Sequence, residues 1–164
     1  EKKLAGGGPL MDLGIYPLQA ACMAAGEVAP VAVTAKERPK ERPEFFRDVE
    51  ETLDWTMEYA NGARAECVTS YNGGADFFRA ESERGTLEFG PAFGYGGIQT
   101  RTKRGPLEFA APPCHQAVQI DEFALWVREG RESKVSGRMG RRDLVIIEAI
   151  YEAARTGKRR EVKV

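Results

Sequence analysis

The sequence has 164 residues, of which 42% are hydrophobic and 30% are charged. This length is enough to bury one core, and this composition excludes a wholly disordered chain. Because 24 Lys and Arg residues almost balance 25 Asp and Glu residues, the net charge is −1, which leaves no overall field to attract nucleic acid or membrane. No apolar run is long enough for a spanning helix, and nothing at the N-terminus resembles a signal peptide. We therefore expect one globular domain without a nucleic-acid or membrane partner.

The first expected helix covers about residues 9–25. We interpret the glycine run at 6–8 as a flexible segment that leads into this helix. Asp12 and Tyr16 are four residues apart, so on one helix they would share a face. Between them Gly14 removes side-chain bulk, and Pro17 disfavours ordinary helical geometry at Tyr16. We interpret this as room for another group beside Asp12 and Tyr16. The alternative is a simple surface hydrogen bond between them.

Strands are expected next. Residues 30–36 are rich in β-branched side chains, and the charged, proline-marked segment 38–44 that follows is interpreted as a solvated loop. The alternative for this loop is a phosphate or partner contact. From residue 52 to 59 apolar and polar residues alternate, which predicts a strand with one buried face; the apolar members are Leu53, Trp55, Met57 and Tyr59. Asn61-Gly62 predicts a hairpin turn into a return strand at 64–71.

The second half of the chain continues this antiparallel pattern. Segments 76–81 and 86–89 predict another hairpin, and 107–109 a last short strand. The glycine-rich segment 90–105 lacks the G-x-G-x-x-G spacing of a dinucleotide site, as do residues 6–11, so we interpret it as turns between edge strands.

Two helices are expected to close the chain, at about 116–128 and 141–156, with a polar loop at 136–142. We expect their apolar stripes to cover one sheet face; the stripe residues are Ile120, Phe123, Ala124 and Val127, then Leu144, Ile147, Tyr151 and Ala154. The fold class is therefore α+β, with an open, mostly antiparallel β-sheet covered on one face by helices. A sheet with apolar residues on both sides would need a partner on the other face.

The cysteines do not indicate a disulfide framework or a metal site. Cys22, Cys67 and Cys114 are odd in number and far apart. We expect Cys22 and Cys67 to be small buried apolar residues. Cys114 stands beside the only histidine, His115, but neighbours in sequence rarely face each other productively, so we do not expect a catalytic pair.

The run Gly6-Gly7-Gly8-x-Leu10-x-Asp12-x-Gly14-x-Tyr16 resembles the glucose–fructose oxidoreductase branch of the Gfo/Idh/MocA oxidoreductases. Much of that family has His where this chain has Tyr16. The resemblance continues through residues 55–59 to the end, notably at 149–157. It implies that residues 1–164 are the C-terminal substrate-binding and oligomerisation domain, and that the N-terminal dinucleotide-binding domain is absent.

The resemblance implies hydride transfer between NADP or NAD and a sugar or related polyol. It implies Tyr16 as the acid/base and Asp12 as the group that orients a substrate hydroxyl, with no metal. A free phenol has a pKa near 10, so Tyr16 needs a nearby cation to work near neutrality. In the family that cation is a lysine of a Glu-Lys-Pro motif on the dinucleotide domain, and Glu1-Lys2-Lys3 is not its counterpart. We therefore expect the isolated chain to be inactive, with its cofactor-binding residues unidentified.

The resemblance further implies a homo-oligomer through the open sheet face. It also implies an unpaired sheet edge, because the strand that begins such domains is missing. A cytoplasmic location is expected, with the periplasm as the alternative. Two other functions stay open: a non-catalytic assembly or binding module of the same fold, favoured if Tyr16 is buried in the core, and an unrelated α+β interaction domain. The sequence leaves the substrate and the choice between NAD and NADP undecided.

Overall fold

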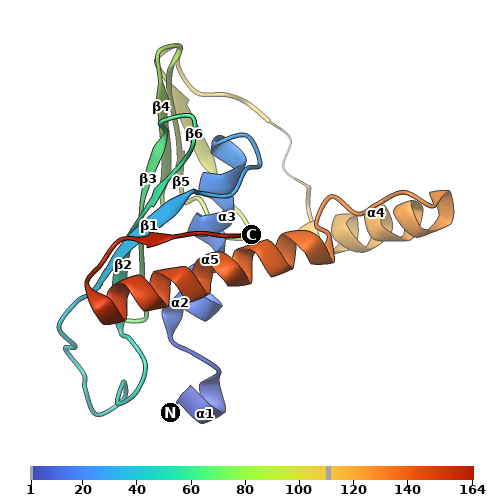
Figure 1. The fold of residues 1–164 in the computed structure, drawn as a ribbon. Coiled ribbons are helices and arrows are strands. Elements are labelled where there is room, and N and C mark those ends of the chain that lie inside the picture. The colour runs from blue at the N-terminus through green and yellow to red at the C-terminus, as the bar shows by residue number, and fades with distance from the viewer. Residues whose placement is uncertain (1, 110–111) are drawn as a thin grey trace. The chain divides into compact units, whose positions relative to one another are not determined.

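The computed structural model describes residues 2–109 and 112–164 (Figure 1). These residues form two compact units. Unit 1 contains the described residues up to Ala75 together with Arg141–Val164. Unit 2 contains the described residues of Asp76–Gly140. The α+β class is confirmed, because both units hold open antiparallel sheets alongside helices. The single expected meander is instead divided into two sheets.

The sheet of unit 1 has four strands in the order β3-β2-β1-β7, and all of its pairs are antiparallel. Its strands are β1 (Ala32–Glu37), β2 (Thr52–Glu58), β3 (Arg64–Ser70) and β7 (Arg160–Glu161). The predicted Asn61–Gly62 turn is confirmed: Gly62 has φ +83°, and the Asn61 Oδ1 accepts a hydrogen bond from the Ala63 N–H at 3.0 Å. The two-residue strand β7 was not predicted.

One face of this sheet is the core. The predicted alternation is confirmed, since Leu53, Trp55, Met57 and Tyr59 are all buried. Helices α3 (Ile15–Ala24) and α5 (Gly137–Thr156) pack onto them with Leu18, Cys22, Ile146, Ile147 and Ile150. Each such aliphatic side chain contributes about 1.5–3 kcal/mol by leaving water. This core supports the candidate site described below.

The opposite face of the same sheet is mostly polar, although Ala32 and the half-buried Val68 also lie on it. Successive side chains of a strand point to opposite faces, and the register places Lys36 beside Asp54 and Thr34 beside Thr56, with Glu66 on the next strand. All five are exposed or half-buried. The hydrophobic alternation of β2 therefore belongs to one face only.

Unit 2 contains a three-stranded antiparallel sheet in the order β4-β5-β6. Its strands are β4 (Phe78–Ser82), β5 (Gly85–Gly90) and β6 (Gln99–Thr102). The predicted hairpin is confirmed by the pairing of β4 with β5, across which the Phe78 and Phe89 rings lie 5.9 Å apart. The strand expected at 107–109 is wrong. Instead of pairing with another strand's backbone, the Leu107 N–H and C=O both bond to the Thr100 hydroxyl, at 2.8 and 2.7 Å.

The helix of unit 2, α4 (His115–Glu129), ends at Gly130 with φ +63°. Its apolar stripe does not cover a sheet face, since Ile120, Phe123 and Val127 are 68%, 55% and 66% exposed. The periodicity correctly identified an apolar face of the helix, but it carries no information about what covers that face. The polar loop expected at 136–142 is also wrong, because α5 already begins at Gly137.

Leu144 is half-exposed rather than part of the buried stripe of α5.

No helix in the described part of the chain is long and apolar enough to cross a membrane.

Candidate active site at the α2–α3 joint

The helix expected over residues 9–25 is two helices, α2 (Pro9–Asp12) and α3 (Ile15–Ala24). The N–H groups of Leu13 and Gly14 both donate to the Pro9 carbonyl at 2.8 Å, and a new helix then begins. Asp12 is thus the last residue of α2, whereas Tyr16 lies in the first turn of α3. The expectation that they share one helical face is wrong, because the helix is interrupted between them.

Gly14 is required by the packing of this joint. A Cβ at Gly14 would lie 2.7 Å from the Leu10 carbonyl oxygen and 2.8 Å from the Leu10 Cδ1. The space that Gly14 leaves is therefore occupied by Leu10 rather than open for another group. Pro17 is the third residue of α3, where its missing N–H removes no intrahelical bond. It therefore lies in the first turn of the second helix, where proline is tolerated, and Tyr16 before it is helical.

Two glycines of the run before α2, Gly7 and Gly8, are buried and packed against side chains, so this part of the run is not a flexible segment. Only Gly6 is exposed, and nothing lies within 4 Å of the position that a Cβ would take there. A Cβ at Gly8 would lie 2.5 Å from the Glu50 Oε2, and one at Gly7 would lie 3.2 Å from the Tyr151 hydroxyl. Glu50 is only 5% exposed, and its Oε1 accepts hydrogen bonds from the Leu10 N–H at 3.0 Å and the Tyr151 hydroxyl at 2.9 Å. Burial, with the adjacent Glu50 charge and hydrogen bond, raises the pKa of Tyr151. The buried carboxylate thus fixes the N-terminal end of α2.

Asp12 is held by Tyr71, a residue that the sequence analysis did not select. The Tyr71 hydroxyl donates to the Asp12 Oδ2 at 2.7 Å. Burial, followed by the hydrogen bond and the charge of Asp12, raises the pKa of Tyr71 to about 12. Tyr71 comes directly after β3, 59 residues from Asp12, and no sequence spacing connects the two. Within residues 2–109 and 112–164, the Asp12 Oδ1 has no hydrogen-bond partner.

Tyr16, the candidate acid/base, lies at the surface of unit 1 and is 51% exposed. It is therefore accessible from solvent rather than part of the core. This exposure removes the condition that would favour a non-catalytic module, namely a Tyr16 buried in the core.

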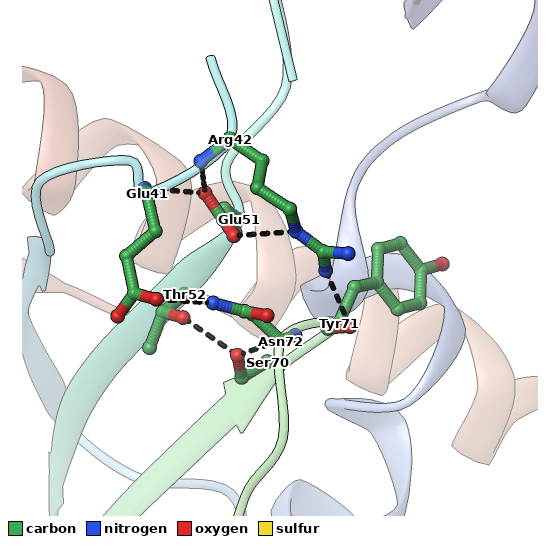
Figure 2. Close-up of polar contacts among 7 residues, drawn as sticks. All are labelled: Glu41, Arg42, Glu51, Thr52, Ser70, Tyr71 and Asn72. Atoms are coloured by element: carbon green, nitrogen blue, oxygen red, sulfur yellow. Dashed lines mark hydrogen bonds and ion pairs between the residues drawn. The ribbon is translucent and has the colours of Figure 1, made fainter. Parts of the chain in front are cut away.

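The loop between β1 and β2 is fixed to the sheet through Glu51, as Figure 2 shows. Glu51 is 2% exposed, and its Oε2 accepts hydrogen bonds from the Glu41 and Arg42 N–H groups at 2.8 and 3.0 Å. Burial by itself would raise the pKa of Glu51, but these bonds and the Arg42 guanidinium, 3.6 Å from Oε1, outweigh it and lower the pKa. The charged loop is exposed as expected, yet its backbone is anchored.

The same cluster extends to the residues that follow β3. The Asn72 Nδ2 donates to the Glu41 Oε2 at 2.6 Å, and the Arg42 Nη2 donates to the Tyr71 carbonyl at 3.4 Å. The hydroxyls of Thr52 and Ser70 lie 2.6 Å apart across the strand pair (Figure 2). The β1–β2 loop and the end of β3 are thus joined beside the candidate site.

The cysteines are all free: Cys22 is buried as predicted, Cys67 is half-buried and Cys114 is exposed. Burial raises the pKa of Cys67 to about 12, so it is not an activated thiol. Among the described residues, no group of three or more His, Cys, Asp or Glu side chains is placed to hold a metal ion.

Comparisons with known proteins identify the family of this chain. Residues 1–88 match the model of the GFO/IDH/MocA C-terminal domain. D-xylose 1-dehydrogenase (NADP(+)) 2 of Haloferax volcanii is 27% identical to this chain, over 92% of the chain and 47% of its own length.

Among solved structures, the aldose-aldose oxidoreductase of Caulobacter crescentus, complexed with glycerol, has a TM-score of 0.90 and 37% identity. The match covers 98% of this chain and 49% of that one. The myo-inositol 2-dehydrogenase of Lactobacillus plantarum shares the fold, with a TM-score of 0.70 and 16% identity over 95% of this chain and 49% of its own. This chain spans about half the length of these relatives. With more than half of its residues matched by the family model, the chain belongs to the GFO/IDH/MocA C-terminal domain family.

Proposed function

We propose that residues 1–164 are the substrate-binding half of an NAD(P)-dependent oxidoreductase that acts on a CH–OH group of a sugar or related polyol. The family assignment supports this proposal. So do the names of the relatives, which act on xylose, aldoses and myo-inositol. The dinucleotide-binding half then lies outside this chain, in agreement with its span of about half of each relative.

The observation that carries the proposal is that an exposed carboxylate and an exposed phenol lie on either side of one helix joint. Asp12 ends α2, Tyr16 begins α3, and both are accessible. The Asp12 Oδ1 has no hydrogen-bond partner in the described part of the chain, so it can accept a bond from an added hydroxyl. Such a site suits a neutral polyhydroxy compound, which offers many hydroxyl donors.

In this reaction Tyr16 exchanges a proton with the substrate hydroxyl, and Asp12 orients a hydroxyl by accepting its hydrogen bond. The bound nicotinamide supplies or accepts the hydride. Because a free phenol has a pKa near 10, Tyr16 requires a neighbouring cation in the complete enzyme to exchange its proton near neutrality. We expect that cation from the dinucleotide-binding half.

The glycine run of this chain does not fit the pyrophosphate of a dinucleotide. The space at Gly7 is taken by Met11 and Tyr151, and that at Gly8 by the buried carboxylate of Glu50, which repels a phosphate. We therefore assign no residue of this chain to the cofactor. It follows that the isolated chain has no turnover with NAD(P)H, and measurable turnover would contradict this.

The test is made on the full-length protein, titrated with NADP and with NAD while bound-cofactor fluorescence is followed. We expect Tyr16→Phe to retain cofactor binding and to lower kcat for sugar oxidation by about 10²–10⁴-fold, since that is the usual contribution of a general acid/base. Tyr95→Phe, which alters a 79% exposed tyrosine of unit 2, is the matched control and should leave kcat unchanged. A folded full-length protein that binds neither nucleotide would leave the non-catalytic assembly module as the better hypothesis.

We also propose that the polar face of the β3-β2-β1-β7 sheet joins copies of the chain into a homo-oligomer. Support comes from the family resemblance and from the Thr and charged side chains on that face, which are half-buried or exposed. A contact through the Lys36–Asp54 side of the sheet would be polar and sensitive to salt. Sedimentation analysis across a range of salt concentrations should show dissociation as ionic strength rises; a monomer at all concentrations would contradict the proposal.

A further inference from the structure

Tyr71 is linked to the candidate site by one hydrogen bond, from its hydroxyl to the Asp12 Oδ2 at 2.7 Å. A carboxylate with one oxygen engaged presents its other oxygen in a defined direction. Oδ1 is that other oxygen here, and no described residue bonds to it. Oδ1 keeps this direction only if Tyr71 and Asp12 are themselves fixed in place by the rest of the structure.

Tyr71 is held at its backbone and at its ring. Its N–H donates to the Glu51 carbonyl at 3.1 Å, and its own carbonyl accepts the bond from Arg42. Its ring stacks on Phe46 with centroids 6.2 Å apart, and the Arg42 guanidinium lies 5.9 Å from the Phe46 ring centroid. Figure 2 shows the Tyr71 ring projecting away from the Glu51 cluster, so the cluster fixes the base of the side chain and leaves the hydroxyl free to reach Asp12.

Helix α2, which carries Asp12, is held at its other end. The Leu10 N–H donates to the buried Glu50, and the Thr69 hydroxyl donates to the Pro9 carbonyl at 3.2 Å. Thr69 lies near the end of β3 and Tyr71 directly follows the strand, so this short stretch of chain contacts both ends of the four-residue helix. The hydrogen bond between Tyr71 and Asp12 therefore joins two fixed elements.

We propose that Tyr71 is a positioning residue, whose hydroxyl orients the Asp12 carboxylate so that Oδ1 accepts a hydroxyl of the polyol substrate. This inference rests on the function proposed above. Tyr71 does not touch the reacting atoms in this role; it acts through Asp12. The Glu51–Arg42 cluster holds the backbone of Tyr71, and Phe46 holds its ring.

The test is a double-mutant cycle in the full-length enzyme, with NADP or NAD and with D-xylose, D-glucose and myo-inositol as the probes. Tyr71→Phe keeps the ring and its stacking on Phe46 and removes only the hydroxyl. We expect it to lower kcat/KM about tenfold when Asp12 is present, because small misplacements of a positioning group cost at least this much. In an Asp12→Ala background the same change should alter kcat/KM less than about twofold, because no side-chain oxygen is left at position 12 for Tyr71 to orient.

The outcomes separate this inference from the function on which it rests. Equal losses in both backgrounds would show a structural role for Tyr71 and overturn the inference, as would an unchanged kcat/KM in Tyr71→Phe. Cofactor affinity within about twofold of the parent shows that each variant is folded, and Tyr95→Phe controls for the loss of a phenol elsewhere. A parent enzyme that binds no nucleotide and oxidises none of the probes overturns the proposed function, and the positioning role with it.

Discussion

Units 1 and 2 are built from similar sequence patterns, yet they bury their apolar side chains very differently. Both combine an antiparallel sheet with a helix of clear apolar periodicity. In unit 1 the sheet and helices enclose a continuous core. In the described part of unit 2, Trp126 is the one buried hydrophobic side chain, while Phe77 and Tyr95 are 61% and 79% exposed. An apolar stripe marks a surface that can be buried; a facing surface decides whether it is.

The largest expected effect tests this difference in burial. Ile150→Ala removes a fully buried side chain of α5 and should lower the free energy of unfolding by about 2–5 kcal/mol. Phe123→Ala removes a larger side chain from the exposed stripe of α4 and should change it by less than about 0.5 kcal/mol. Urea unfolding of both variants at one protein concentration measures the two values. Comparable losses would mean that the α4 stripe is covered and that the two units do not differ as described.

A smaller effect is expected from adding one methyl group to each unit. Gly8→Ala places its Cβ 2.5 Å from the Glu50 carboxyl and 2.7 Å from the Glu50 carbonyl oxygen, which belongs to the backbone and cannot rotate away. We expect a loss of about 1–3 kcal/mol in unfolding free energy. Gly96→Ala in unit 2 meets nothing within 4 Å and should be neutral or stabilising by up to about 1 kcal/mol. A tolerated Gly8→Ala in thermal unfolding would show that Glu50 is not held where we describe it.

The smallest effect concerns pH. The folded pKa of Glu51 lies below its ordinary value of 4.5, so folding favours the ionised form. Its contribution is complete above that ordinary value and is lost as the pH falls through the lower folded value. Glu51→Gln should therefore flatten the acid side of the pH–stability curve, whereas Glu83→Gln, at an exposed turn of unit 2, should not. Parallel curves for the parent and Glu51→Gln would contradict the anchoring role of Glu51.

The parts of the fold that were predictable depend on local patterns. The alternation in β2 and the Asn61–Gly62 turn are encoded within a few residues, and both were predicted correctly. Strand β7 has only two residues, and it forms because it meets Ala32 and Val33 far away in the sequence. No periodicity can be detected in so short a segment, which explains why it was missed.

The candidate site was predictable only in part, for the same reason. Asp12 and Tyr16 were selected by their resemblance to a known motif, and the structure places both at an accessible surface. The single helix expected to carry them was wrong because contacts from Glu50 and Thr69 fix α2 separately, and Gly14 lets it pack closely before α3 starts. Tyr71 reaches Asp12 only through the folded sheet, so no reading of neighbouring residues could have found it.

The anchoring of α2 by distant residues has a consequence for biosynthesis. A four-residue helix is too short to persist in water without tertiary contacts. Its contacts come from Glu50, from Thr69 and, through the Glu50 carboxylate, from Tyr151. The residues of α2 therefore leave the ribosome before Glu50, Thr69 and Tyr151, and they acquire their full set of partners only when helix α5 has emerged. A segment translated before all of its partners is thus among the last parts of unit 1 to be secured.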